Sequence, residues 1–319
     1  MKQLVAGLVI GLTLSVPAFA ETLVVYSAGP KPLSDQLAKG FKAKSGIDVE
    51  MFQSTAGKIM ARYQAEKSNP HADVMISASW GHAITLDQEG DLLAYTSPNA
   101  ANVPASLKTS SYVAQGAAAL AIAYNPKSGV PTPQHWADLA LPEYRDQVTM
   151  PDPAKSGSAL TLVQGLVTLD ADKAWNLFDQ LAANDVLVPG ANKAALNPVL
   201  QGAKSVVFGA VDYIVIDAKQ KGENIEVVYP SEGTVLAPRP VMIMKSSQHQ
   251  DAAKQFVDYL LSDEGQQLVA EQYILPARTD IQAKRPGWND LKIIDFDAGE
   301  AAAQAAETQS KFAEIMAAK

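Results

Sequence analysis

The chain has 319 residues, 47% of them hydrophobic and 19% charged, which is typical of a globular protein whose core is large enough to divide into two lobes. Its formal net charge is −8, and the absence of a basic run argues against nucleic acid or anionic membranes as partners. The chain contains no cysteine, which excludes disulfides, thiolate metal sites and a lipid-modified cysteine.

The N-terminal 20 residues have the pattern of a secretory signal peptide. Lys2 supplies a positive charge, residues 4–16 are apolar, and residues 18–20 (AFA) form a small-x-small cleavage site. The apolar run is shorter than the roughly 20 residues that a membrane span requires. We therefore predict cleavage after residue 20 and localisation in the periplasm, with residues 1–20 absent from the mature protein.

Strand and helix patterns alternate through the first third of the mature chain. Apolar runs at 22–26, 47–52 and 73–76 predict strands, and a helix is predicted after each of them. Each predicted strand runs into a turn of small or hydroxyl residues. These turns contain the candidate ligand-binding residues Ser27, Ala28, Gly29, Ser54, Thr55, Ser77 and Ser79, together with Trp80.

This alternation predicts a mostly parallel sheet with helices on both faces. Such sheets bind ligands at the carboxyl ends of their strands, so the serine-containing turns should share one rim of the sheet. Two other interpretations remain open. Each hydroxyl could simply cap the helix that follows it, and Trp80 could pack against its own helix.

A second unit follows a long apolar strand predicted at 117–124. Strands are predicted at 148–150, 205–208 and 225–229, with helices at 171–183, 194–202 and 214–221. Asp212 and Tyr213 fall at the end of the 205–208 strand and are further candidate ligand-binding residues. Asp212 could instead cap the following helix.

The turn at Ser156, Gly157 and Ser158 is the strongest candidate anion site in this unit. It joins a strand to a helical pattern, and the uncovered first-turn N–H groups of a helix, with its dipole, attract anions. The alternative is an ordinary connection in which a serine caps its own helix and nothing binds.

Two α/β lobes joined by two extended hinge strands would explain this order. We expect residues 21–124 and 238–319 to form the first lobe, each lobe being a mostly parallel sheet flanked by helices, and residues 125–237 to form the second. Proline-flanked crossings near residues 124 and 234–240 suit a hinge. Glu232 and Arg239 lie there, where a salt bridge between the lobes or a ligand contact would explain them.

The chain resembles the periplasmic solute-binding proteins of ABC importers, in the ferric-ion-binding-protein-like family that includes organophosphate- and phosphonate-binding relatives. The resemblance implies a type II periplasmic-binding-protein fold and a membrane permease as partner. It covers nearly the whole mature chain and depends on residues 23–27 (LVVYS), 65–74 (AEKSNPHADV), 152–153 (DP), 156–159 (SGSA), 228–234 (VYPSEGT) and 256–262 (FVDYLLS) with Gly265 and Gln266.

The ligand implied by the resemblance is less certain than the fold. Iron-binding members place a histidine and a glutamate where this chain has Pro30 and Gly57, and their adjacent tyrosine pair falls at Asp212 and Tyr213. Ferric iron prefers several anionic oxygens, and this set offers few. We therefore expect an oxyanion ligand, a phosphonate or phosphate ester, with Asp212 free for an amine or hydroxyl. Ferric iron remains the alternative.

An enzyme is the rival class. The sequence contains no G-x-S-x-G, H-E-x-x-H, Walker A or C-x-x-C motif, and we interpret its four histidines as scattered surface residues. A secreted hydrolase using a serine of the 156–158 turn is a remote alternative. We expect a monomeric binding protein with no catalytic residue, metal ligand, cofactor or nucleic-acid partner.

Overall fold

The computed structural model describes residues 22–318. The predicted signal peptide and its cleavage site lie outside these residues. No helix within the described range has both the length and the apolar character needed to cross a membrane.

The predicted alternation of strands and helices in the first third of the chain is confirmed. Strand β1 pairs in parallel with β2 on one side and with β3 on the other, so the three strands end at the same edge. Pro30 precedes α1, which buries its apolar face, and Gly46 ends it in a left-handed conformation. The elements are β1 (Thr22–Ser27), α1 (Lys31–Ser45), β2 (Asp48–Gln53), α2 (Ala56–Ala65), β3 (Val74–Ile76) and α3 (Trp80–Gln88).

Two long antiparallel strands connect the lobes. Strand β4 (Tyr112–Tyr124) pairs first with β8 (Leu236–Ile243) and then with β6 (Val206–Val211), so it belongs to both lobes. β4 begins earlier than the predicted strand because Tyr112 and the residues after it pair with β8. Pro238 and Pro240 lie inside β8 and not in a loop, opposite an irregularity in β4.

The second lobe contains short strands surrounded by helices. Strand β5 pairs in parallel with β6, and β7 pairs with the end of β4. The elements are β5 (Val148–Thr149), α4 (Gly157–Leu169), α5 (Ala171–Ala183), α6 (Asn192–Leu200), α7 (Asp212–Gln220) and β7 (Glu226–Val228). Short 3₁₀ helices lie at Pro98–Ala100, Ala105–Leu107, Trp136–Ala140, Pro142–Tyr144 and Trp288–Asp290.

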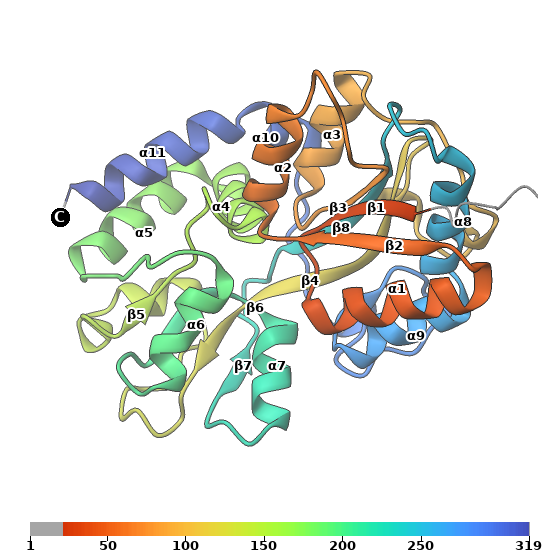
Figure 1. Cartoon of the computed structure of the whole chain (residues 1–319). Helices are drawn as coiled ribbons and strands as arrows, with labels where there is room; N and C mark the ends of the chain where they lie inside the picture. Colours follow the sequence, from red (N-terminus) through yellow and green to blue (C-terminus); the bar gives the residue numbers. More distant parts are fainter. Residues whose placement is uncertain (1–21, 319) are drawn as a thin grey trace, which may run out of the picture.

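The sheet of the described chain is mixed, with strand order β2-β1-β3-β8-β4-β6-β5. Its parallel pairs lie in the individual lobes, and its antiparallel pairs all involve β4 or β8, the strands that connect them. Figure 1 shows these two strands running between the lobes. One hydrophobic cluster continues across the junction, from Phe41 and Phe256 in the first lobe to Phe178 and Phe208 in the second.

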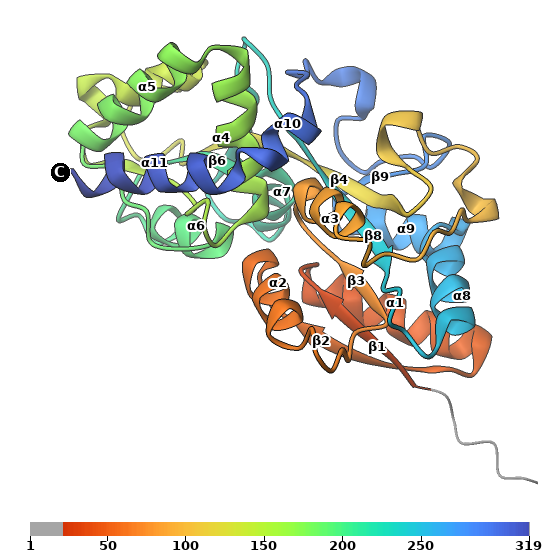
Figure 2. The ribbon, with the colours of Figure 1, turned by 90° about the horizontal axis from the view of Figure 1, so that it is seen from above.

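The C-terminal part begins on the first lobe and ends on the second. Helix α10 contacts both α3 and α4, and α11 packs on α4 and α5 (Figures 1 and 2). The elements are α8 (Gln250–Leu260), α9 (Asp263–Glu271), β9 (Leu275–Pro276), α10 (Ala298–Ala303) and α11 (Ala305–Ala317). The sequence-based lobe boundaries stay a prediction, and the last helix contacts helices of the range assigned to lobe two.

Candidate functional site

The first two serine-containing turns meet at the ends of β1 and β2. Ser27 is buried, and its hydroxyl accepts a hydrogen bond from the Gly29 N–H at 3.0 Å. The Ser54 N–H donates to the Ser27 carbonyl at 3.0 Å, and the Ala28 N–H donates to Ile76 O of β3 at 2.8 Å. Thr55 caps α2 through a 3.4 Å hydrogen bond from the Lys58 N–H. The parallel pairing therefore brings Ser27, Ala28, Gly29, Ser54 and Thr55 to one rim, as predicted.

The third turn completes this rim. The Ser77 hydroxyl accepts from the Ser79 N–H at 3.1 Å and lies 2.9 Å from Nδ1 of His82. His82 is half-buried and not an exposed surface residue as interpreted from the sequence, and burial lowers its pKa to about 4. The Trp80 ring makes an edge contact with Tyr112, with centroids 5.0 Å apart. Packing therefore explains Trp80, and its contact with ligand stays a prediction.

The Ser156 turn forms the start of α4. The Ser156 hydroxyl accepts from the Ala159 N–H at 3.2 Å, so Ser156 caps its own helix. Ser156 also donates to Oδ1 of Asn192 at 2.7 Å, and Nδ2 of Asn192 donates to the Ser158 hydroxyl at 3.1 Å. Asn192 begins α6 and was missed in the sequence, because nothing there indicates that α6 starts beside α4.

Capping does not use all the donors at this helix end. Within residues 22–318 the N–H groups of Gly157 and Ser158 have no hydrogen-bond acceptor. They lie at the positive end of the 13-residue helix α4. An anion-binding role for this turn is thus compatible with the cap, and it stays a prediction.

The turns of the two lobes face one another. A Cβ atom placed on Gly157 would lie 2.6 Å from Cβ of Ser79 and 2.9 Å from the Ala78 carbonyl oxygen. A Cβ atom on Gly57 would lie 3.1 Å from the carbonyl oxygen of Ala154. Glycine permits this approach because it lacks a side chain. The first turns of α4 and α2 thus contact the opposite lobe directly.

Asp212 lies at the start of α7 and forms an internal ion pair. Its carboxylate is buried, pairs with the buried guanidinium of Arg285, and accepts from the Tyr229 hydroxyl at 3.1 Å. The N–H groups of Tyr213 and Ala119 also donate to it, at 2.8 and 3.2 Å. Burial raises the pKa of Asp212, and the Arg285 guanidinium opposes this shift.

The sequence suggested that Asp212 is free to bind a ligand amine or hydroxyl, whereas in the structure its carboxylate is paired with Arg285. Its oxygens are already engaged inside the protein, so a ligand amine or hydroxyl would have to join or displace Arg285. Arg285 was missed because it lies in an irregular segment far along the chain, with no motif around it.

Tyr213 lies beside Arg239, a residue of the hinge strand β8. The Arg239 guanidinium is 5.9 Å from the Tyr213 ring centroid, and its Nη2 donates to the Ala28 carbonyl at 2.7 Å. The hypothesis of a salt bridge between Arg239 and Glu232 is wrong. Glu232 instead accepts from the Trp136 N–H at 2.7 Å and lies 2.9 Å from Nδ1 of His135.

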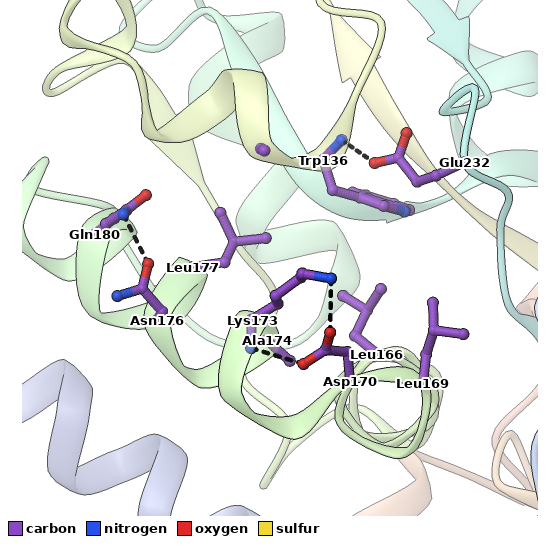
Figure 3. Close-up of a pocket in the computed structure, with 11 residues that line it drawn as sticks. Trp136, Leu166, Leu169, Asp170, Lys173, Ala174, Asn176, Leu177, Gln180 and Glu232 are labelled. Atoms are coloured by element: carbon purple, nitrogen blue, oxygen red, sulfur yellow. Dashed lines mark hydrogen bonds and ion pairs between the residues drawn. The ribbon is translucent and has the colours of Figure 1, made fainter.

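A cavity of about 570 Å³ lies in the second lobe, away from the serine turns. Figure 3 shows Leu166, Leu169 and Leu177 of α4 and α5 facing Trp136 and Glu232 across it. Its walls include none of the predicted ligand-binding residues. We do not assign it to solute capture, because one lobe alone supplies its lining.

The described residues contain no group of three or more histidine, cysteine, aspartate or glutamate side chains arranged to hold a metal ion.

Residues 69–300 match a family described as bacterial extracellular solute-binding protein. The chain belongs to this family. The predicted resemblance is thereby confirmed.

Relatives of this solute-binding protein point to the same group. It is 24% identical over 311 residues to a putative 2-aminoethylphosphonate-binding periplasmic protein of Salmonella typhimurium, covering 88% of this chain and 91% of the relative. It is 29% identical to an uncharacterised protein of Haemophilus influenzae, covering 92% and 89% of the two chains.

Solved structures confirm the type II two-lobed fold. The periplasmic binding protein AfuA of Actinobacillus pleuropneumoniae, with exogenous fructose 6-phosphate bound, superposes with a TM-score of 0.86 at 26% identity, covering 93% of this chain and 99% of AfuA. Iron-bound HitA of Pseudomonas aeruginosa superposes with a TM-score of 0.83 at 22% identity, covering 92% and 99%. The solute-binding protein is thus the non-enzymatic binding component of an ABC importer, which works with a solute and a membrane permease.

Proposed function

We propose that this protein works in the periplasm and captures a phosphonate or phosphate ester between its lobes for delivery to the permease. The observation that carries the proposal is the contact between the Ser156–Ser158 turn and the rim of the first lobe. Gly157, at the N-terminal end of α4, lies against Ala78 and Ser79. Hydroxyl groups of both lobes and the free backbone N–H groups at the start of α4 would then surround one small oxyanion.

The relatives support this ligand class in different ways. One relative is named for 2-aminoethylphosphonate and a solved neighbour holds fructose 6-phosphate. Both ligands combine a phosphorus oxyanion with a second polar end. Another neighbour binds iron, but its similarity supports the fold alone.

Capture depends on the free-energy difference between open and closed states. Each lobe offers half of the site, and a solute that contacts both halves favours the closed form by its differential affinity for the two states. The lobes would rotate about the paired strands β4 and β8, with little change inside each lobe. The closed form would then dock on the permease.

A thermal-shift screen of metal-free protein tests the ligand class. 2-aminoethylphosphonate, fructose 6-phosphate, inorganic phosphate and ferric iron would each be added separately, because a ligand raises stability by RT ln(1 + [L]/Kd). We expect a shift with at least one phosphorus oxyanion. A shift with ferric iron alone would contradict the proposal.

The Ser156→Ala/Ser158→Ala double variant tests the turn. We expect a tenfold or larger rise in the dissociation constant for the anion found in the screen, measured by calorimetry. Ser262→Ala is the matched control because Ser262 caps α9 through a 3.2 Å bond to the Gly265 N–H. Both variants lose a cap, worth about 1 kcal/mol, but only the first should weaken binding. Equal affinities would remove the turn from the site.

A further inference from the structure

Arg239 carries a buried positive charge without a countercharge. The residue is 4% exposed, and a guanidinium stays protonated in proteins. Its close neighbours are the Ala28 carbonyl at 2.7 Å and the Tyr213 ring at 5.9 Å. Burial raises the pKa of Tyr213, so this phenol is uncharged. Across residues 22–318, no carboxylate forms an ion pair with Arg239.

This arrangement is unfavourable for the protein alone. A charged group taken out of water loses hydration free energy, and neutral dipoles recover only part of it. A countercharge at hydrogen-bonding distance would recover much more. A buried arginine without a carboxylate partner is therefore a place where an anion stabilises the structure.

Arg239 lies where the two lobes meet. It belongs to the hinge strand β8, donates to the first-lobe rim at Ala28, and approaches Tyr213 of the second lobe. A Cβ atom placed on Gly29 would lie 3.9 Å from its Nη2, so the guanidinium is next to the rim turn. Tyr213 of the second lobe contributes to its burial, so we expect opening of the lobes to hydrate it.

We propose that Arg239 is the specificity-determining cation of the interlobe site and pairs with the oxyanion of the captured phosphonate or phosphate ester. This inference rests on the proposed function. The planar guanidinium offers parallel N–H donors that match two oxygens of a phosphorus oxyanion. A neutral solute of the same shape leaves the charge uncompensated, so it favours the closed state less.

Calorimetry with paired probes tests the role of Arg239. Fructose 6-phosphate and 2-aminoethylphosphonate are titrated into the wild type, Arg239→Gln, Arg239→Lys and the control Arg145→Gln. Arg145 pairs with Asp185 on the surface of the second lobe. Fructose, which is neutral, and ethanolamine, which carries only an ammonium charge, are the probes without the oxyanion.

We expect the wild type to bind at least one oxyanion probe and to prefer it by 100-fold or more to its counterpart without the oxyanion. Arg239→Gln should lower the affinity for the oxyanion probe by at least 30-fold and reduce that preference in proportion. Arg239→Lys keeps the positive charge but not the planar guanidinium, so it should weaken oxyanion binding less than Arg239→Gln does. Arg145→Gln should bind like the wild type.

The outcomes separate this inference from the function on which it rests. If the wild type binds an oxyanion and Arg239→Gln binds it within threefold, while the Ser156→Ala/Ser158→Ala variant is impaired, the role of Arg239 is overturned and the function stands. If the wild type binds none of the oxyanions, both are overturned. If Arg239→Gln does not fold, the test is whether the wild type prefers fructose 6-phosphate to fructose. Equal affinities for these two solutes would overturn the inference.

Discussion

Two buried arginines beside the start of α7 have opposite electrostatic surroundings. Arg285 is paired with Asp212, and the Tyr229 hydroxyl accepts from the same guanidinium at 2.9 Å. Arg239 lies against the next residue, Tyr213, and forms no ion pair with a carboxylate of the described residues. One helix start therefore has an ion-paired arginine on one side, although its buried Nη1 has no hydrogen-bond partner among residues 22–318, and an arginine without a carboxylate partner on the other.

This difference separates a structural arginine from one suited to a ligand. The charge of Arg285 is balanced within the chain, and its bonds join the C-terminal segment to α7. The charge of Arg239 is balanced only if an anion arrives. The same residue type thus serves stability in one place and recognition in the other, and the neighbouring carboxylate decides which.

Removing Asp212 should have the largest effect. Asp212→Asn leaves the Arg285 guanidinium buried without its partner, and we expect unfolding free energy to fall by about 3–5 kcal/mol in urea without ligand. Asp217→Asn is the control on the same helix, because its pair with Lys221 is exposed and should contribute less than about 1 kcal/mol. Equal losses would show that the Asp212–Arg285 pair has no special role.

Acid should destabilise the protein through His82. Burial lowers the pKa of this histidine from 6.5 to about 4, so between these values the unfolded chain binds more protons than the folded one. Stability should therefore fall as the pH drops through this window, by at most about 3 kcal/mol from this group.

His82→Gln should flatten this part of the pH dependence in urea unfolding. His71→Gln, at an exposed position of the same lobe, should leave the profile unchanged. A steep wild-type profile that His82→Gln does not alter would exclude His82 as its cause.

Gly157→Ala tests the contact between the lobes. The added Cβ would overlap sterically with Ser79 and Ala78. We expect this overlap to destabilise the closed state by about 1–3 kcal/mol. Ligand affinity should fall by about tenfold or more while ligand-free stability changes little. In the control Gly81→Ala, the new Cβ would have its closest neighbour at 3.5 Å. Similar affinities for both variants would contradict closure through Gly157.

Arg239→Gln should have the smallest effect on ligand-free stability. No ion pair is lost, so we expect unfolding free energy to change by less than about 1 kcal/mol without ligand. Arg285→Gln should lose several times more, because it leaves Asp212 buried and unpaired. Losses of equal size in urea unfolding would remove the distinction between the two arginines.

The sequence predicted the features that depend on local patterns. Apolar runs correctly predicted β1, β2 and β3 and the turn after each. Because these strands are parallel, their turns lie at one edge of the sheet, as expected. The Ser156 cap also followed from its neighbours in the chain. Local pattern was sufficient because each of these features involves residues close in sequence.

The missed features depend on contacts between distant residues. No local signal pairs Arg285 with Asp212, or places Asn192 beside Ser156. The sequence predicted an extended hinge crossing around Arg239, and pairing with β4 makes this stretch part of β8. The side chain of Arg239 is consequently fixed at the interlobe surface, which only the three-dimensional structure could show.

The most direct test of the account is the distance between the lobes in solution, with and without ligand. The chain has no cysteine, so Lys58→Cys on α2 and Lys193→Cys on α6, both exposed positions, would accept a fluorophore pair without background. We predict that 2-aminoethylphosphonate or fructose 6-phosphate raises energy transfer in the wild type and that neither does so in Arg239→Gln. Energy transfer that stays constant with both oxyanions in the wild type would contradict capture by lobe closure.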